Sequence, residues 1–300
     1  MSSKGYDVVI VGSGAAGLAA ALGAAEHARE NGRPASIALL ERSDEAERGG
    51  NTRYSPSYMR LEAPDRLAAG FEDDMLAVSG GRSDPRIVAR LARDAVATLS
   101  WARGFGLDFH RPVTYFLTAA APRIQPVGGG AAVVETLAGA AQAAGVSVLY
   151  RTCAERLTLD ERGAVAGIET SDANGTVSTL RAQAVVLACG GYEASTEMLT
   201  ASLGEKAAKM RLITRGTSFN RGEGIRMALD AGAKPSGDWD GFHCEPVDPR
   251  SDAPEAVVLV YPYGIVVDRS GRRFVDEGSA RVDETWKRSR ERSPSKWTAR

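Results

Sequence analysis

The sequence predicts an α/β fold built on a Rossmann-like parallel sheet, and three features of the first fifty residues indicate it. Residues 6–11 form a short, β-branched apolar run that is typical of a buried strand. The glycine-rich turn Gly12-Ser13-Gly14-Ala15-Ala16-Gly17 follows directly and leads into an Ala- and Leu-rich helix that ends near Asn31-Gly32. A second apolar run at 36–40 ends at an acid, Glu41. This order of strand, glycine turn, helix, strand and acid is typical of a dinucleotide-binding βαβ unit.

Each glycine of the turn has its own physical role. Gly12 permits the tight turn, Gly14 lets the backbone approach a diphosphate, and Gly17 lets the helix pack closely on the strand. The start of the helix offers free N–H groups and the positive end of its dipole to the phosphates. Glu41 stands where a carboxylate can bind ribose hydroxyls. The sequence therefore predicts a dinucleotide site.

Later glycine segments indicate which dinucleotide is bound. Gly49-Gly50-Asn51-Thr52-Arg53 can bring main-chain amides against a second ring system, although a surface loop of small and polar residues is the alternative. The buried-strand pattern at 184–188 runs into Cys189-Gly190-Gly191. A helix then begins after Gly222-Glu223-Gly224 and is closed by Gly232. A plain nicotinamide dehydrogenase needs none of these later segments.

The chain between these segments alternates helices and hairpins. Residues 62–104 are predicted to be helical, and a second helix is predicted at 131–144. Short strands follow, with hairpin turns at 160–163 and 172–175. This β-meander leads back into the strand at 184–188, which belongs to the main sheet.

The pattern changes near Gly237, which gives the predicted domain organisation. We expect a dinucleotide-binding domain at 1–237 and the start of an incomplete α+β capping domain at 238–285. Residues 286–300 are rich in Lys and Arg and are expected to be a disordered basic tail.

Composition and charge limit the class of protein. The 33 glycines and the 6% of aromatic residues fit an α/β enzyme whose helices lie close to its sheet. A formal net charge of −1 gives no general attraction to nucleic acid or to anionic membranes. No apolar stretch approaches the roughly 20 residues of a membrane span. We therefore expect neither nucleic acid nor a membrane span.

The three cysteines and the start of the chain predict a cytoplasmic protein. Cys153, Cys189 and Cys244 have no CxxC spacing, which suits a reducing compartment, and the first residues lack a signal-peptide pattern. Cys244 follows His243, but two adjacent ligands without partners do not make a metal site. We expect no metal.

Five segments together resemble the FAD-binding flavoproteins of the fumarate reductase and succinate dehydrogenase type. They are GSGAAG with Glu41, GGNT, VVLACGG, GEGIRMALDAGA and GRRFVDEG, and they occur in the family's order. Within that family, GGNTR, GDWDGFH and YPYGIVVDRSGRRFVDEG look most like the tricarballylate dehydrogenases. The resemblance spans almost all of residues 5–285.

The resemblance implies an FAD cofactor and a set of contacts. By it, FAD contacts fall at Ala15, Glu41, Asn51, Thr52, Ala154 and Glu223, with Ala154 contributing its main chain. We place the rest of the cofactor site at Gly12, Ser13, Gly14, Ala16, Gly17, Arg42, Gly49, Gly50, Gly190 and Gly191. Succinate dehydrogenases bind the flavin covalently through a histidine near the GGNT position. This loop has no histidine, so FAD is expected to be held noncovalently.

The resemblance also implies two residues at the substrate end. Relatives place a substrate-carboxylate histidine at the position of His243, although a hydrogen-bonded structural histidine is the alternative. The spacing from Arg273 to Arg281 is that of the fumarate reductase motif whose last arginine donates the substrate proton, although a surface arginine is the alternative. Arginine is a poor general base, so Arg281 is better suited to bind a carboxylate and pass a proton on. Arg53 is a further candidate for a substrate carboxylate.

The activity that these features imply is dehydrogenation of a small polycarboxylate, of the tricarballylate to cis-aconitate type, with hydride transfer to flavin N5. Fumarate reductases carry a proton-relay glutamate and arginine where this chain has Val257 and Val260, which favours dehydrogenation. The alternatives are a fumarate reductase, a 3-oxosteroid dehydrogenase-like flavoenzyme, and a catalytically inactive FAD-binding fragment. A separate electron-acceptor protein is a possible partner. Relatives continue well beyond residue 285, so we expect a fragment or a loss of the family's reading frame near Trp286.

Overall fold

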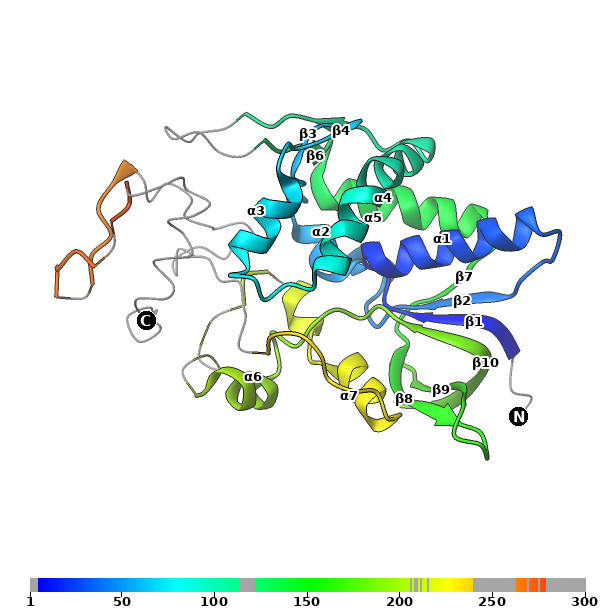
Figure 1. The fold of residues 1–300 in the computed structure, drawn as a ribbon. Helices are drawn as coiled ribbons and strands as arrows, with labels where there is room; N and C mark the ends of the chain where they lie inside the picture. The colour runs from blue at the N-terminus through cyan, green and yellow to red at the C-terminus, as the bar shows by residue number, and fades with distance from the viewer. Residues whose placement is uncertain are drawn as a thin grey trace.

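The structure is a computed structural model. It describes residues 5–113, 122–239 and 263–278, apart from 206, 208, 209, 211, 215, 269 and 275. Strand β1 (Gly5–Val11) lies inside a mixed sheet and pairs in parallel with β2 (Ile37–Leu40) and with β10 (Val177–Leu187). Strand β7 (Ser147–Leu149) continues the parallel part beyond β2. Figure 1 shows a layer of helices that covers one side of this sheet.

The other half of the sheet is an antiparallel meander. Strands β8 (Cys153–Leu159) and β9 (Val165–Ser171) pair antiparallel to each other, and β9 pairs antiparallel to β10. The strand order within the described residues is therefore β7-β2-β1-β10-β9-β8. The predicted α/β fold, a parallel sheet with helices and a β-meander, is confirmed.

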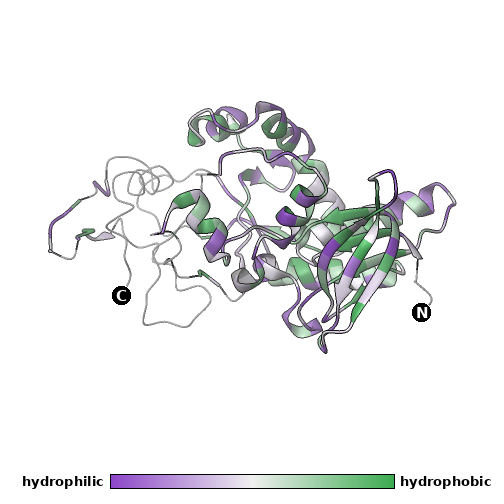
Figure 2. Cartoon of the chain, turned by 90° about the horizontal axis from the view of Figure 1, so that it is seen from below, coloured by the Kyte–Doolittle hydropathy of each residue, from purple (hydrophilic) through white to green (hydrophobic). Residues whose placement is uncertain are grey.

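Alternation along the central strands divides the core into two clusters. Ile10 and Leu39 face one side and pack with helices α1 (Ala15–Glu30), α4 (Pro85–Gly104) and α5 (Gly129–Ala143). Val9 and Val11 face the other side, where Met227 of α7 (Glu223–Asp230) packs. Successive strand side chains point to opposite faces, so one strand supplies both clusters. Figure 2 shows hydrophobic and hydrophilic residues alternating along the strands.

One secondary-structure prediction is wrong. Residues 62–104 do not form helix from their start, because β3 (Leu61–Ala63) and β4 (Arg66–Leu67) form a small antiparallel hairpin. Pro64 in the turn has no amide hydrogen to donate to a helix. Helix appears only in α3 (Phe71–Val78) and in α4, which Asp84 caps by accepting the Arg86 N–H at 2.8 Å.

The remaining elements are short. They are the 3₁₀ turns η1 (Glu45–Glu47) and η3 (Gly216–Phe219), helices α2 (Gly50–Tyr54) and α6 (Thr196–Leu203), and strands β5 (Phe109–His110) and β6 (Gln125–Pro126). Among the helices of the described residues, none combines the length and the apolar character that a membrane crossing requires.

Candidate functional site: a dinucleotide cradle

The glycine turn between β1 and α1 exposes main-chain donors. Helix α1 begins after Gly14, which supplies no side-chain cap. Within the described residues, the amide N–H groups of Gly14 and Ala16 have no acceptor, whereas that of Ala15 donates to Thr52 Oγ1 at 3.1 Å. Free N–H groups at a helix N-terminus, together with the helix dipole, favour a bound anion. The turn can therefore hold a phosphate.

Close backbone approach explains two of the glycines. Gly12 has a φ of +101°, and a Cβ there would lie 2.6 Å from the carbonyl oxygen of Ala188 at the end of β10. A Cβ at Gly17 would lie 1.8 Å from the carbonyl oxygen of Gly12. Side chains are thus excluded where β1, β10 and α1 meet, and the phosphate-binding turn can lie close to the sheet.

The buried carboxylate of Glu41 ties two loops together. One of its oxygens accepts from the hydroxyl of Ser13, and the other accepts the Ser43 N–H at 2.8 Å and the Ser43 hydroxyl at 3.0 Å. Ser13 Oγ in turn accepts the N–H of Gly49 at 3.1 Å. A carboxylate has about four acceptor positions. With the Ser13 N–H, which lies 3.3 Å from the first oxygen, Glu41 accepts four hydrogen bonds within the protein, so it fixes the turn, and a ribose hydroxyl would have to share one of these positions.

The second glycine loop forms the short helix α2 beside the first. Gly49 caps it with a φ of +105°, and a Cβ at that position would lie 2.5 Å from Val134 Cγ2 of α5. The side chain of Thr52 receives the Ala15 N–H, so the two loops contact each other directly. Asn51 Oδ1 accepts the Thr214 hydroxyl at 3.3 Å.

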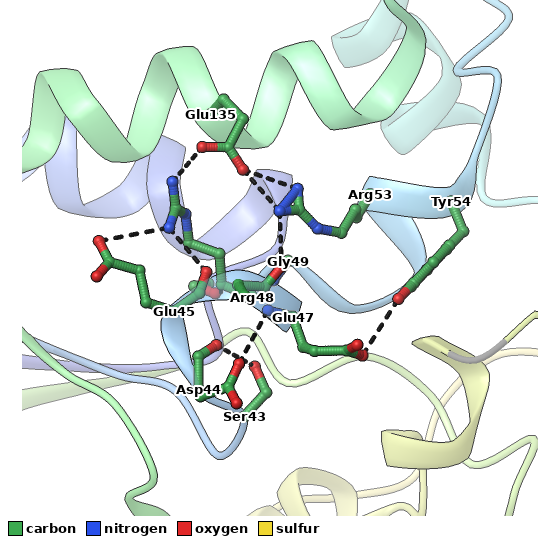
Figure 3. A network of polar contacts seen from close by, with 11 residues as sticks. Ser43, Asp44, Glu45, Glu47, Arg48, Gly49, Arg53, Tyr54 and Glu135 are labelled. Atoms are coloured by element: carbon green, nitrogen blue, oxygen red, sulfur yellow. Dashed lines mark hydrogen bonds and ion pairs between the residues drawn. The ribbon is translucent and has the colours of Figure 1, made fainter.

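An ion-pair cluster anchors α2 to α5. Figure 3 shows Arg48 and Arg53 converging on Glu135. Both terminal nitrogens of Arg53 lie 2.7 Å from Glu135 Oε1, and Arg53 also donates to the carbonyl of Ala46 at 2.8 Å. Arg53 does not line the dinucleotide cavity, and its role as a ligand of a substrate carboxylate stays a prediction. Its guanidinium holds the glycine loop in place.

A second polar cluster joins β2, β8 and α7. The guanidinium of Arg42 lies 2.9 Å from Cys153 Sγ, 3.1 Å from Glu223 Oε1 and 3.1 Å from the carbonyl of Phe219. Burial disfavours the charge on Arg42, but the contacts with Cys153 and Glu223 prevail and raise its pKa. In contrast, burial raises the pKa of the nearby Cys189 thiol and keeps it protonated at neutral pH.

These clusters surround one cavity. Of the sixteen predicted cofactor residues, the cavity is lined by all except two, Gly17 and Gly191; the fourteen are Gly12, Ser13, Gly14, Ala15, Ala16, Glu41, Arg42, Gly49, Gly50, Asn51, Thr52, Ala154, Gly190 and Glu223. Gly17 serves helix packing, and the carbonyl of Gly191 accepts the Gly222 N–H at 3.0 Å. Residues far apart in the sequence thus form one wall.

Sequence reasoning missed several wall residues, among them Thr152, Cys153, Phe219, Asn220 and Met227. Thr152 and Cys153 directly precede Ala154, and Asn220 lies just before the Gly222-Glu223-Gly224 turn, so adjacency was the available signal. The predicted substrate residues His243 and Arg281, and Cys244, lie outside the described residues. Within the described part, no three His, Cys, Asp or Glu side chains come together as metal ligands.

Comparison with known proteins identifies the class as a flavoprotein. A family model described as an FAD binding domain matches residues 7–293. The chain therefore belongs to the FAD-binding family of the fumarate reductase and succinate dehydrogenase flavoproteins, whose cofactor is FAD.

Two curated relatives and one solved structure show the extent of the likeness. The chain is 29% identical over 289 residues to the vinyl phenol reductase of Lactiplantibacillus plantarum, covering 91% of this chain and 56% of the relative. It is 28% identical over 295 residues to the fumarate reductase (cytochrome) of Shewanella frigidimarina, covering 92% and 48%. The open conformation of a flavocytochrome c3 fumarate reductase matches with a TM-score of 0.76 at 24% identity, covering 94% of this chain and 50% of that one, and shows the same fold. The chain spans about half the length of the curated relatives that it matches.

The cavity fits the cofactor of this family. The free N–H donors of Gly14 and Ala16 suit a diphosphate, and the carboxylate of Glu41 borders the same cavity. The glycine backbone of α2 lines the same cavity. Bound FAD would supply a two-electron acceptor at this site.

Proposed function

We propose that this chain is the FAD-binding part of an oxidoreductase that dehydrogenates a small polycarboxylate, as in the conversion of tricarballylate to cis-aconitate. The observation that carries the proposal is the single cavity that joins the βαβ turn to the Gly49–Thr52 loop, in a chain of the fumarate reductase family. Such a cavity fits a dinucleotide with a second ring system. Family membership directs the chemistry to carbon–carbon bond oxidation or reduction.

The substrate end of the proposal rests on Arg281 and His243. Both arginines of the GRRFVDEG segment have local partners: Arg272 Nε lies 3.1 Å from Ser270 Oγ, and Arg273 Nε lies 3.0 Å from Glu277 Oε2. Glu277 is buried, which opposes its charge, but the Val266 N–H and Arg273 prevail and lower its pKa. Arg272 and Arg273 thus have local structural partners, and the family resemblance supports Arg281 as the arginine for the substrate carboxylate.

The direction of the reaction follows from the proton-relay positions. Valine at 257 and 260 cannot carry protons, so efficient delivery of a proton to a double bond is not expected. We propose that FAD is held noncovalently, and that a separate acceptor protein receives the electrons. The division into an FAD-binding domain at 1–237 and a capping segment at 238–285 belongs to the same proposal.

Anaerobic spectrophotometry tests the substrate. The FAD-loaded 300-residue chain is mixed with tricarballylate or succinate, and flavin absorbance near 450 nm is followed. Bleaching by tricarballylate is the expected result. Bleaching by neither acid, with FAD retained, would contradict the substrate and favour an inactive FAD-binding fragment. Re-oxidation of reduced flavin by fumarate, without bleaching by tricarballylate, would favour the fumarate reductase.

An arginine pair tests the role of Arg281. Arg281→Ala is expected to abolish bleaching by tricarballylate while the FAD dissociation constant stays within about twofold of the wild type. Arg288→Ala, in the basic tail that follows this segment, is the control and should bleach normally. An active Arg281→Ala protein would remove this residue from the mechanism. Release of yellow FAD on acid precipitation checks that the cofactor is noncovalent.

A further inference from the structure

One polar side chain on the cavity wall takes no part in the contacts described so far. Asn220 is only 7% exposed and lines the cavity. Within the described residues, its carboxamide makes no hydrogen bond to another group. Its side-chain atoms are not among the fully enclosed polar atoms without a partner, so the amide borders the cavity, where a ligand can reach it. Asn220 is therefore a polar group that awaits a ligand.

The other polar side chains of the wall are already engaged. Each side chain with a nitrogen or oxygen atom that lines the described cavity, other than Asn220, has a hydrogen-bond partner within the protein; these are Ser13, Glu41, Arg42, Asn51, Thr52, Thr152 and Glu223. Those bonds hold the wall together. Asn220 is different, because none of its side-chain bonding capacity is used by the fold.

The position of Asn220 is fixed by the backbone around it. Its carbonyl oxygen accepts the Ala194 N–H at 2.8 Å, which joins the turn after β10 to the turn before α7. Gly190 has a φ of +79°, and a Cβ at that position would lie 2.6 Å from Asn220 Oδ1. The carboxamide thus lies directly against the backbone of Gly190. Any side chain at position 190 would occupy the space that the carboxamide fills.

The chemistry of the cavity suggests what Asn220 binds. Gly12 of the phosphate turn lies against Ala188 and Cys189. The next residue in the chain, Gly190, lies against the side-chain amide of Asn220. A diphosphate has more acceptor oxygens than two helix N–H groups can satisfy. The amide of Asn220 can donate a hydrogen bond without adding charge.

We propose that Asn220 is a direct FAD-binding residue whose side-chain amide donates a hydrogen bond to the diphosphate of the cofactor. The proposal rests on FAD binding alone and does not depend on the identity of the substrate. It predicts that Asn220 contributes to affinity and not to the stability of the unliganded chain, because the side chain has no partner inside the protein.

Titration of the apoprotein with FAD, followed by flavin fluorescence, tests this. Asn220→Ala is expected to raise the FAD dissociation constant at least roughly tenfold, the lower end of the range for a hydrogen bond to a charged group. Its apoprotein melting temperature should stay within about two degrees of the wild type. Asn174→Ala is the matched control, because Asn174 lies in the exposed 172–175 turn.

A second variant tests the donor. Asn220→Asp keeps the shape of the side chain but places a negative charge beside the diphosphate, so it should bind FAD more weakly than Asn220→Ala. The proposal is overturned if Asn220→Ala binds FAD within about twofold of the wild type. It is overturned equally if Asn220→Asp binds as tightly as the wild type. A fall in apoprotein stability without a change in FAD affinity would show a structural role instead.

Discussion

At the residue scale, Gly12 illustrates how position and backbone conformation act together. Its φ of +101° is one that side-chain-bearing residues rarely adopt, and the carbonyl of Ala188 occupies the space of a Cβ. The glycine was predictable from the turn, but the neighbour that enforces it was not. Ala188 follows β10, more than 170 residues further along the chain, and a single sequence does not show this pairing.

Gly12→Ala should therefore impair both folding and cofactor binding. Strain at the positive φ and the clash with Ala188 would shift the turn that presents Gly14 and Ala16. We expect the FAD dissociation constant to rise at least roughly tenfold and the melting temperature to fall by several degrees.

A glycine in helix α1 supplies the control for Gly12→Ala. Gly23 has open space around its Cβ position, and alanine there improves helix propensity. Gly23→Ala should leave FAD binding unchanged and slightly raise the melting temperature. A Gly12→Ala protein that behaved like Gly23→Ala would contradict the close approach of β1 and β10.

At the element scale, the sequence predicted the elements whose signals are local. The unit β1–α1–β2 follows from an apolar run, a glycine turn and an apolar helix side, and the meander β8–β9–β10 follows from two turn sequences. The hairpin β3–β4 was missed because its strands are only three and two residues long. Helix α2 was missed because Gly49-Gly50 reads as a loop, and its helical form depends on contacts with α5.

The contact between α2 and α5 gives a prediction at this scale. Glu135 pairs with Arg48 and Arg53, whose side chains are only 12% and 18% exposed, although that of Glu135 itself is 48% exposed. Glu135→Ala would leave two guanidinium groups facing each other and loosen the Gly49–Thr52 loop. We expect the FAD dissociation constant to rise by roughly threefold, in keeping with the modest energy of exposed ion pairs.

A glutamate of the meander is the matched control for Glu135→Ala. Glu169 pairs with Arg156 at 2.8 Å, far along the sheet from the glycine loop, so Glu169→Ala should not change FAD affinity. High salt should reduce the difference between Glu135→Ala and the wild type, because it screens ion pairs. Equal FAD affinity in both variants at low salt would show that the cluster does not support the loop.

At the scale of the whole molecule, the candidate site is assembled from segments that the sequence separates widely. The cavity takes residues from the first glycine turn, the end of β2, the α2 loop, the start of β8, the end of β10 and the start of α7. Motif order predicted that these segments belong together. It did not predict Arg42 against Cys153, or the unpaired Asn220, because those arrangements arise only when the sheet brings the strand ends to one edge.

A ligand that contacts all these segments must stabilise the whole domain, since the unfolded chain cannot bind it. We expect the melting temperature to rise with FAD concentration, by roughly 5 °C at about a hundred times the dissociation constant, which corresponds to about 2.7 kcal/mol. Differential scanning fluorimetry with an external dye measures this shift.

NAD is the matched comparison, because it carries the same adenosine and diphosphate but lacks the flavin. It should engage the turn of Gly14 and Ala16 without the α2 loop, and give a smaller shift. An equal shift with NAD would mean that the Gly49–Thr52 loop contributes nothing to the choice of cofactor, and no shift with FAD would mean that these segments do not form one binding site.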